Sequence, residues 1–410
     1  LQIHRLSGAQ LHHTKTICPM NNKKQTGRLL ALDILRGITI AGMILVNNPG
    51  SWGHIYAPLE HAPWHGLTPT DLVFPFFMFI MGVSTYMSLR KYDFRLSRAA
   101  VIKIVRRSIV IFFIGLAIAW LSLTLRRLGG GRPVAEAVFN FDHIRMLGVM
   151  PRLAICYGVG SLLALSMSRR ALAWLIGVVL VAYGLVLLLC NGLVFSEENI
   201  ISVIDRAVLG TDHMYADTID GVTIKFDPEG LLSTIPSICH MLIGFLCGYL
   251  LMQVRDNRDR ICRLFIVGTV LTFAGFLLSY GMPINKKIWS PTFVLTTCGL
   301  ASSLLALLIW IIDIRGHKRW CRFFEAFGVN PLFMYCLGAV LTILMSFIKV
   351  PYAAASAGSI SLKGWIYKAV CMPLAADDAT LASFIFAIAF VAFNWCIGYI
   401  LYKKKIYIKI

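Results

Sequence analysis

The chain has 410 residues, of which 58% are hydrophobic and only 14% are charged, and its formal net charge is +19. A soluble globular protein carries about 25% charged residues, and no ordinary core hides so large an apolar excess. The composition therefore excludes a soluble enzyme and predicts an all-α polytopic membrane protein, whose helices are solvated by lipid.

The chain opens with a polar segment, residues 1–27, which lacks the apolar stretch of a signal peptide. Met20 offers an alternative start within this tail, and we expect residues 1–19 before it to have no function of their own. A short basic tail, residues 403–410, closes the sequence.

Between these tails, residues 28–402 are predicted to form one transmembrane domain of about ten helices. Each apolar run is long enough to cross a hydrocarbon core of about 30 Å. The ten runs lie near residues 29–49, 69–89, 108–125, 147–167, 171–192, 231–252, 261–281, 291–312, 323–347 and 381–402.

The distribution of basic residues predicts the orientation of these spans. If the N-terminus is cytosolic, the inside segments hold 26 Lys and Arg and the outside segments hold 11. Such a bias indicates cytosolic termini, N-in/C-in, because cytoplasmic loops collect positive charge. The basic charge is thus a topology signal, and nucleic acid is not expected as a partner.

Two segments between spans differ from simple loops. Residues 193–230 form the only sizeable soluble piece and contain eight acidic residues, which predicts a small extracytoplasmic cap. Residues 351–373 are apolar but interrupted by Gly and Lys, and they are expected to be interfacial or re-entrant.

The first outer loop is the most informative stretch, because it has no Lys or Arg but contains His54, His61 and His65 together with two tryptophans. Histidine changes charge near neutral pH and is the usual general base. An alternative is that these side chains anchor the loop at the lipid headgroups. A zinc site is also conceivable from the spacing of His61 and His65, but Pro63 lies between them before any helix starts. We favour a catalytic histidine, with no metal.

Three outer segments have the sequence pattern of a helix start. Thr68-Pro69-Thr70-Asp71 is typical of an N-cap, a proline at the first helical position and a capping-box acid. Asp227-Pro228-Glu229-Gly230 and Ser290-Pro291 repeat the pattern. Singly, each motif only begins a helix, but three positive helix ends beside a histidine-rich loop would form a pocket that stabilises an anionic group.

Ionisable residues within the spans are costly and usually functional. Asp33 and Arg36 are three apart on the first span, so they are expected to pair on one helix face. Arg152 follows a proline near the outer end of the fourth span and has no evident local partner. The pair Asn330-Pro331 interrupts the ninth span, where we expect a hinge or a packing role.

These motifs, in this order, resemble heparan-α-glucosaminide N-acetyltransferase over about residues 28–402. The combination is specific even though each piece alone is weak. The matching positions are Arg28, Asp33, Arg36, Gly37, Asn47, His61 to Trp64, Gly66 to Pro75, Gly148 to Arg152, Asp227 to Gly230, Pro283 to Ser290 and Asn330.

The resemblance implies a transmembrane N-acetyltransferase that moves acetyl from cytosolic acetyl-CoA to the amine of a glucosaminide-type sugar on the extracytoplasmic side. It implies that His61 matches the active-site histidine and Asn47 its polar neighbour. We further predict supporting roles for Asp71, Arg152 and Glu229. For acetyl-CoA binding we predict five residues: Arg36, Asn285, Lys286, Trp289 and Ser290.

The resemblance also implies a bacterial relative in the inner membrane, and it suggests a homodimer. The natural acceptor and the choice between direct transfer and an acetyl-histidine intermediate stay open. The alternative function is a transporter for an amino sugar or glycan, which the charges within the spans would serve. The transporter does not need the histidine-rich loop.

Overall fold

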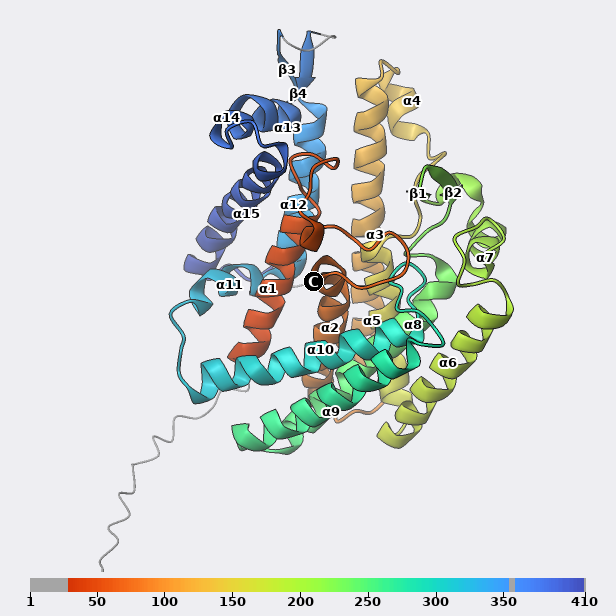
Figure 1. Cartoon of the computed structure of the whole chain (residues 1–410). Coiled ribbons are helices and arrows are strands. Elements are labelled where there is room, and N and C mark those ends of the chain that lie inside the picture. Colours follow the sequence, from red (N-terminus) through yellow and green to blue (C-terminus); the bar gives the residue numbers. More distant parts are fainter. Residues whose placement is uncertain (1–28, 354–357, 409–410) are drawn as a thin grey trace, which may run out of the picture.

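The computed structural model describes residues 29–353 and 358–408, and these residues form a bundle of long helices with only short strands (Figure 1). This confirms the all-α membrane fold class predicted from the sequence. The expected polar tail, residues 1–27, lies outside the described residues.

Within the described part of the chain, eight helices are each long and apolar enough to cross a membrane. Two of them include a short 3-10 or π-helical end. They are α2 (Val73–Leu89, between the 3-10 turns Pro69–Leu72 and Arg90–Tyr92), α3 (Arg98–Gly129), α5 (Val149–Ser166), α6 (Arg169–Leu189), α8 (Leu231–Gln253), α9 (Asn257–Leu278), α10 (Pro291–Ile309, continued by the π-helix Trp310–Ile314) and α15 (Ala379–Lys403).

The other two predicted spans are a short helix and a bent pair. Helix α1 (Leu30–Val46) has 17 residues, which at 1.5 Å per residue gives about 26 Å and lies at the lower limit for spanning. Helices α11 (Cys321–Gly328) and α12 (Pro331–Phe347) meet at 81°, so the predicted interruption of the ninth span is confirmed.

The side chain of Asn330, at this bend, holds a distant part of the chain. Its Nδ2 donates to the carbonyl of Ile406 at 2.8 Å, and its Oδ1 accepts the N–H of Ile408 at 2.8 Å. The segment that follows α15 is therefore tied to the joint between α11 and α12.

Helix α3 begins ten residues earlier than the predicted apolar run. Ser97 caps it by accepting the N–H of Ala100 at 3.3 Å, and the helix then runs for 32 residues. Its first turns carry the basic residues Arg98, Lys103, Arg106 and Arg107. The apolar run does not include them because it detects only the hydrophobic part of a helix.

The remaining elements are short. Residues 193–230 contain a helix and a hairpin, and in the described part of 351–373 there is no helix long enough to span. The elements are α4 (Val134–Phe139), α7 (Ile200–Leu209), β1 (Ala216–Ile219) antiparallel to β2 (Val222–Lys225), β3 (Lys349–Pro351) antiparallel to β4 (Ser359–Ser361), α13 (Leu362–Trp365), the π-helix Ile366–Cys371, α14 (Met372–Leu374) and the 3-10 turns Ala57–Leu59 and Thr211–His213.

Glycines allow α2 and α8 to pack with their backbones in contact. A Cβ atom on Gly82 would lie 2.0 Å from the carbonyl oxygen of Met241, and one on Gly244 would lie 2.2 Å from that of Phe79. Small residues allow such close approach between membrane helices. The contact fixes the starts of α2 and α8 relative to each other, and both starts carry predicted site residues.

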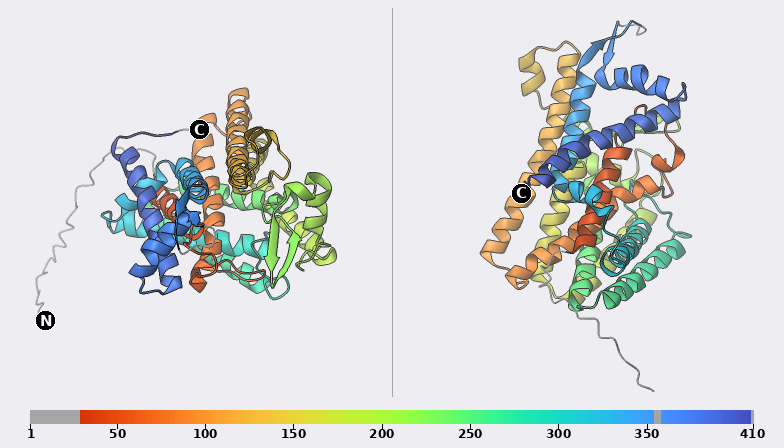
Figure 2. Two further views of the ribbon diagram at one scale, coloured as in Figure 1. Left: turned by 90° about the horizontal axis from the view of Figure 1, so that it is seen from above. Right: turned by 90° about the vertical axis from the view of Figure 1, so that its left-hand side faces the viewer.

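The two views of Figure 2 show where the peripheral elements lie. Helix α7 and the β1–β2 hairpin lie together on one side of the bundle, away from α15. Helices α9 and α10 run side by side (Figure 1). Helix α3 is the longest of the described helices and buries few of its side chains.

Candidate active site

The histidine-rich loop between α1 and α2 is attached to the start of α2 by a buried carboxylate, Asp71. The predicted capping box is confirmed: Asp71 Oδ2 accepts the N–H of Thr68 at 3.2 Å and its hydroxyl at 3.0 Å. The same oxygen accepts the N–H of Ala62 at 3.1 Å. The other oxygen, Oδ1, lies 2.7 Å from Nδ1 of His61. Asp71 is only 1% exposed, so its charge is stabilised by these donors.

Lys286, from the turn between α9 and α10, joins this pair. Its Nζ lies 3.2 Å from Asp71 Oδ1 and 3.0 Å from His61 Nδ1. Burial lowers the pKa of Lys286 below its ordinary value, although Asp71 and Glu229 act to raise it. One carboxylate oxygen thus faces an ammonium group and an imidazole nitrogen.

Asp71 accepts a hydrogen bond from Nδ1 of His61, which favours the tautomer with its proton on Nδ1. Lys286 then donates to the same carboxylate oxygen rather than to the ring. Within the described residues, only Nδ1 of His61 has a hydrogen-bonding partner, and the side chain is 39% exposed. Nε2 is therefore free to accept a proton or to attack an electrophile.

The turn that carries Lys286 is fixed by its own polar groups. Ser290 caps α10 as predicted, accepting the N–H of Phe293, and also accepts the N–H of Asn285 at 3.0 Å. The Asn285 side chain accepts the N–H of Ile288 at 3.1 Å and approaches Nδ1 of His65 at 3.3 Å. Asn285 and Ser290 hold the turn, and their predicted contact with acetyl-CoA stays a prediction.

Trp289 ends this turn with an unusual backbone. Its φ of 50° lies in the left-handed region, where a bulky residue persists only if its surroundings hold it. The ring is 1% exposed and packs edge-on against Phe74 at 5.4 Å and Phe293 at 5.1 Å. The guanidinium of Arg152 lies 5.1 Å from the ring centre. Trp289 therefore fills the bundle interior beside the turn that carries Lys286.

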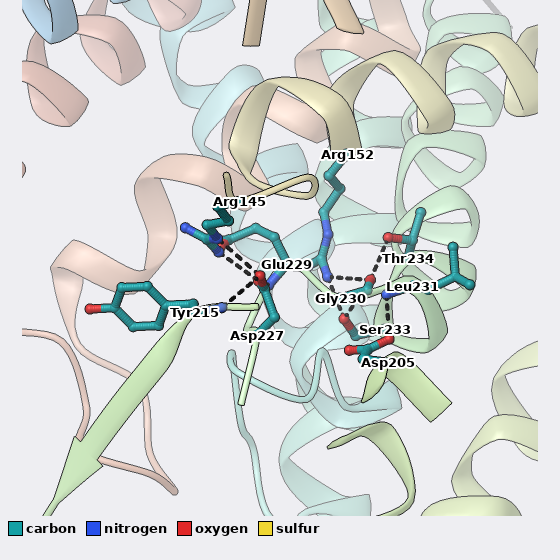
Figure 3. Close-up of polar contacts among 10 residues, drawn as sticks. All are labelled: Arg145, Arg152, Asp205, Tyr215, Asp227, Glu229, Gly230, Leu231, Ser233 and Thr234. Carbon is teal, nitrogen blue, oxygen red and sulfur yellow. Dashed lines mark hydrogen bonds and ion pairs between the residues drawn. The ribbon is translucent and has the colours of Figure 1, made fainter. Parts of the chain in front are cut away.

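A second charged cluster lies beside the first and is drawn in Figure 3. Arg145 binds Asp227 through two hydrogen bonds, at 2.9 and 2.5 Å, and also binds Glu229. Burial alone would raise the pKa of Glu229, but Arg145, Arg152 and Lys286 together hold this pKa below its ordinary value. The ring of Tyr215 lies over the Arg145 guanidinium at 4.9 Å. No sequence pattern had pointed to Arg145.

Arg152 is fully buried beside this cluster, where it donates to the carbonyl oxygen of Gly230 and to the hydroxyl of Ser233 (Figure 3). Its partners come from the start of α8, 78 and 81 residues away. Arg152 and Glu229 thus lie together around the start of α8, and their supporting role stays a prediction.

The predicted cap of α8 by Asp227 is wrong. The N-cap is Gly230, and it makes no side-chain cap. The N–H of Leu231 is instead accepted by Asp205 of α7 at 2.8 Å (Figure 3), while Asp227 binds Arg145. The helix end is closed by a residue distant in sequence, so it offers no free N–H to an oxyanion at that position.

The buried carboxyl of Asp205 predicts a pH dependence of stability. Burial raises its pKa to about 6, against 3.8 in an exposed chain, although the bond from Leu231 opposes the shift. The folded state therefore holds the proton more tightly, and folding loses stability as the pH rises from about 4 to about 6, by roughly 3 kcal/mol. Thermal unfolding of wild type and Asp205→Asn in detergent should show this difference. A constant difference between the two proteins from pH 4 to 7 would contradict the prediction.

Arg36 and Asn47 have partners of their own within the protein. Arg36 pairs with Asp33 at 2.9 Å, as predicted, and donates to the hydroxyl of Ser84 at 2.7 Å. Asn47 is the C-cap of α1, its N–H donates to the carbonyl of Met43 at 3.1 Å, and the residue is exposed. Among the described residues Asn47 makes no hydrogen bond to His61, so its role stays a prediction.

The acidic residues of the cap are largely used within the protein. Asp227 and Glu229 bind Arg145, and Asp217 binds Lys287 at 2.5 Å. Their charge is therefore already balanced by basic groups of the protein. Among the described residues no cluster of His, Cys, Asp and Glu has the geometry of a metal site.

Most of the residues described above lie in a region that matches a known protein family. The sequence profile described as heparan-alpha-glucosaminide N-acetyltransferase, catalytic, matches residues 28–280. That is more than half of the chain and includes His61, Asp71, Arg145, Arg152 and Glu229. The chain belongs to the heparan-alpha-glucosaminide N-acetyltransferase family.

Two relatives in this family have the same name, heparan-alpha-glucosaminide N-acetyltransferase. The human protein is 29% identical over 375 residues, which cover 75% of this chain and 52% of the human one. The mouse protein is 27% identical over 451 residues, which cover 96% of this chain and 62% of the mouse one. The chain thus spans between half and two thirds of the length of these relatives.

Proposed function

We propose that this protein is a membrane acetyltransferase that transfers acetyl from acetyl-CoA to the amine of a glucosaminide-type sugar. The observation that carries the proposal is the pairing of His61 with the buried carboxylate of Asp71. It supplies an exposed imidazole nitrogen, held in one tautomer, within the region matched by an acetyltransferase family.

The chemistry follows from these atoms. An amine is protonated near neutral pH, and only its free form attacks a thioester. His61 Nε2 takes a proton from the amine as nitrogen bonds to the acetyl carbonyl carbon. The carbon–sulfur bond then breaks, and the thiolate of coenzyme A leaves with the proton from the imidazolium. Asp71 stabilises the imidazolium between these steps.

A second route uses the same atoms. His61 Nε2 attacks the acetyl carbonyl, coenzyme A leaves, and the amine then removes acetyl from the histidine. The routes differ in kinetics, because only the second releases coenzyme A before the sugar binds. Single-turnover mixing of enzyme with acetyl-CoA alone separates them: one equivalent of released thiol indicates the acetyl-histidine route.

The finer assignments belong to the same proposal. We place both termini in the cytosol of a bacterial inner membrane, the protein as a homodimer, and His61 on the extracytoplasmic side. Acetyl-CoA then approaches from the cytosolic side, where Arg36 is the nearest candidate for a contact. Its ion pair with Asp33 and its bond to Ser84 show that this cation already has partners.

The direct test mixes purified protein in detergent with radiolabelled acetyl-CoA and glucosamine. Labelled N-acetylglucosamine is the expected product. Uptake of amino sugar into proteoliposomes without acetyl-CoA, and with no acetylated product, would instead support the transporter. The histidine–carboxylate pair favours transfer, since transport needs no such base.

Asp71 is expected to act by positioning His61. In Asp71→Asn the side chain keeps its shape but loses its charge, so kcat should fall roughly 10²–10⁴-fold while the KM for the sugar changes little. The pH profile of kcat should move as well, because the imidazolium has lost its counter-ion. Steady-state kinetics over a pH series measure both effects.

Glu60→Gln is the matched control, since Glu60 is an exposed carboxyl in the same loop. It should leave kcat and its pH profile unchanged. Equal effects of the two substitutions would mean that loop charge in general, rather than the bond to His61, supports the reaction.

A further inference from the structure

A cavity of about 620 Å³ lies between α3, α5, α12 and the β1–β2 hairpin, apart from His61, Asp71 and Lys286. One face of α3 lines it from Gly115 to Arg126, through Ile118, Ala119 and Ser122. These positions follow the helical repeat, so they form a continuous stripe. The eleven steps of 1.5 Å from Gly115 to Arg126 make this stripe about 16 Å long.

The lining of the cavity combines apolar and basic side chains. A Cβ atom on Gly115 would lie 2.6 Å from Cδ of Pro151, so α3 touches α5 at this point. Ile118, Ala339 and Ile343 supply apolar walls. Arg126, Lys225 and Arg145 also line the cavity.

Two of the lining cations, Arg126 and Lys225, have no ion-pair partner among the described residues. Arg145 is neutralised by Asp227 and Glu229, and His143, which also lines the cavity, faces Asp212 at 3.2 Å. The lining therefore has an excess of positive charge.

A neighbouring cavity of about 470 Å³ continues along the seam between α3 and α12. It shares Ser122, Arg126 and Ile343 with the first cavity and adds a further cation, Lys349, which likewise has no ion-pair partner in the described chain. The ligand space is thus elongated, with Arg126 at its centre and apolar walls toward the middle of α3.

We propose that this groove binds a membrane lipid with a phosphate head group, its phosphate on Arg126 and Lys225 and its chain along α3 and α12. The polarity of the groove matches that of such a lipid, because guanidinium and ammonium groups bind phosphate and the apolar stripe suits an acyl chain. Arg126 lies in the last turn of a span, at the level of lipid head groups. The inference goes beyond the acetyl-transfer proposal and does not rest on it.

The test measures binding of fluorescent phosphatidylglycerol to the full chain in neutral detergent, against phosphatidylcholine with the same chains. We expect saturable binding of one phosphatidylglycerol per chain and at least tenfold weaker binding of phosphatidylcholine. Arg126→Gln combined with Lys225→Gln should weaken phosphatidylglycerol binding at least tenfold. Ala339→Phe, which fills the apolar part, should weaken it without changing any charge.

Arg132→Gln is the control, since Arg132 lies just beyond α3 in an exposed pair with Glu136 at 3.2 Å and does not line the groove. It should leave lipid binding unchanged, and so should His61→Ala. Equal binding of both lipids, or unaltered binding by the double variant with an unchanged unfolding temperature, would overturn the proposal. Displacement of the lipid by glycerol 3-phosphate or by coenzyme A would also overturn it, because the groove would then hold a soluble phosphate compound.

Discussion

Replacing His61 with alanine is expected to lower the rate of acetyl transfer by roughly 10²–10⁴-fold or more, because the reaction loses its base or its nucleophile. The side chain is 39% exposed and bonds only through Nδ1 among the described residues, so its loss should not unfold the protein. Transfer of radiolabel from acetyl-CoA to glucosamine measures the rate, and thermal unfolding in detergent checks the fold.

His54→Ala is the matched control for this experiment. His54 is an exposed histidine of the same loop, and its removal should leave the rate unchanged. Added imidazole should restore part of the activity of His61→Ala if the residue acts as a base. Full activity in His61→Ala would remove His61 from the mechanism and turn attention to His65, which approaches Asn285.

Replacing Arg145 with methionine is expected to cause the largest loss of stability, roughly 3–5 kcal/mol. Asp227 is completely buried and takes two hydrogen bonds from Arg145. Without the guanidinium, Asp227 and Glu229 would be two neighbouring carboxylates without their cation. The apparent unfolding temperature in detergent measures the loss.

Two further variants make the result specific. Arg132→Met breaks an exposed pair with Glu136 and should change stability by less than about 1 kcal/mol. Adding Asp227→Asn to Arg145→Met should recover part of the lost stability, because the buried charge is then removed. If Arg145→Met unfolds at the wild-type temperature, the cluster in Figure 3 does not hold the start of α8 in place.

The sequence alone was sufficient to predict the features that depend on residues close together in the chain. Apolar runs located the spans, the capping box of Thr68 and Asp71 was read from four consecutive residues, and Asn330-Pro331 marked the bend. The pairing of Asp33 with Arg36 followed from helical spacing alone.

The site itself depends on contacts that sequence spacing does not encode. Lys286 reaches His61 across 225 residues, and Arg145 reaches Asp227 across 82. Asp227 has the pattern of a helix cap, but the charged guanidinium of Arg145 competes for its carboxylate more strongly than a backbone N–H does. The cap then comes from Asp205, 26 residues before Leu231.

The bonds of Asn330 to the segment after α15 set an order of events during synthesis. Its partner Ile406 is 76 residues further along the chain, so the ribosome must add all of α12 to α15 before the hydrogen bond between Asn330 and Ile406 can form. Until then, the joint between α11 and α12 lacks the two hydrogen bonds of the Asn330 side chain. A chain that stops before Ile406 therefore lacks both bonds of the Asn330 side chain, and with them this connection between the bend and the segment after α15.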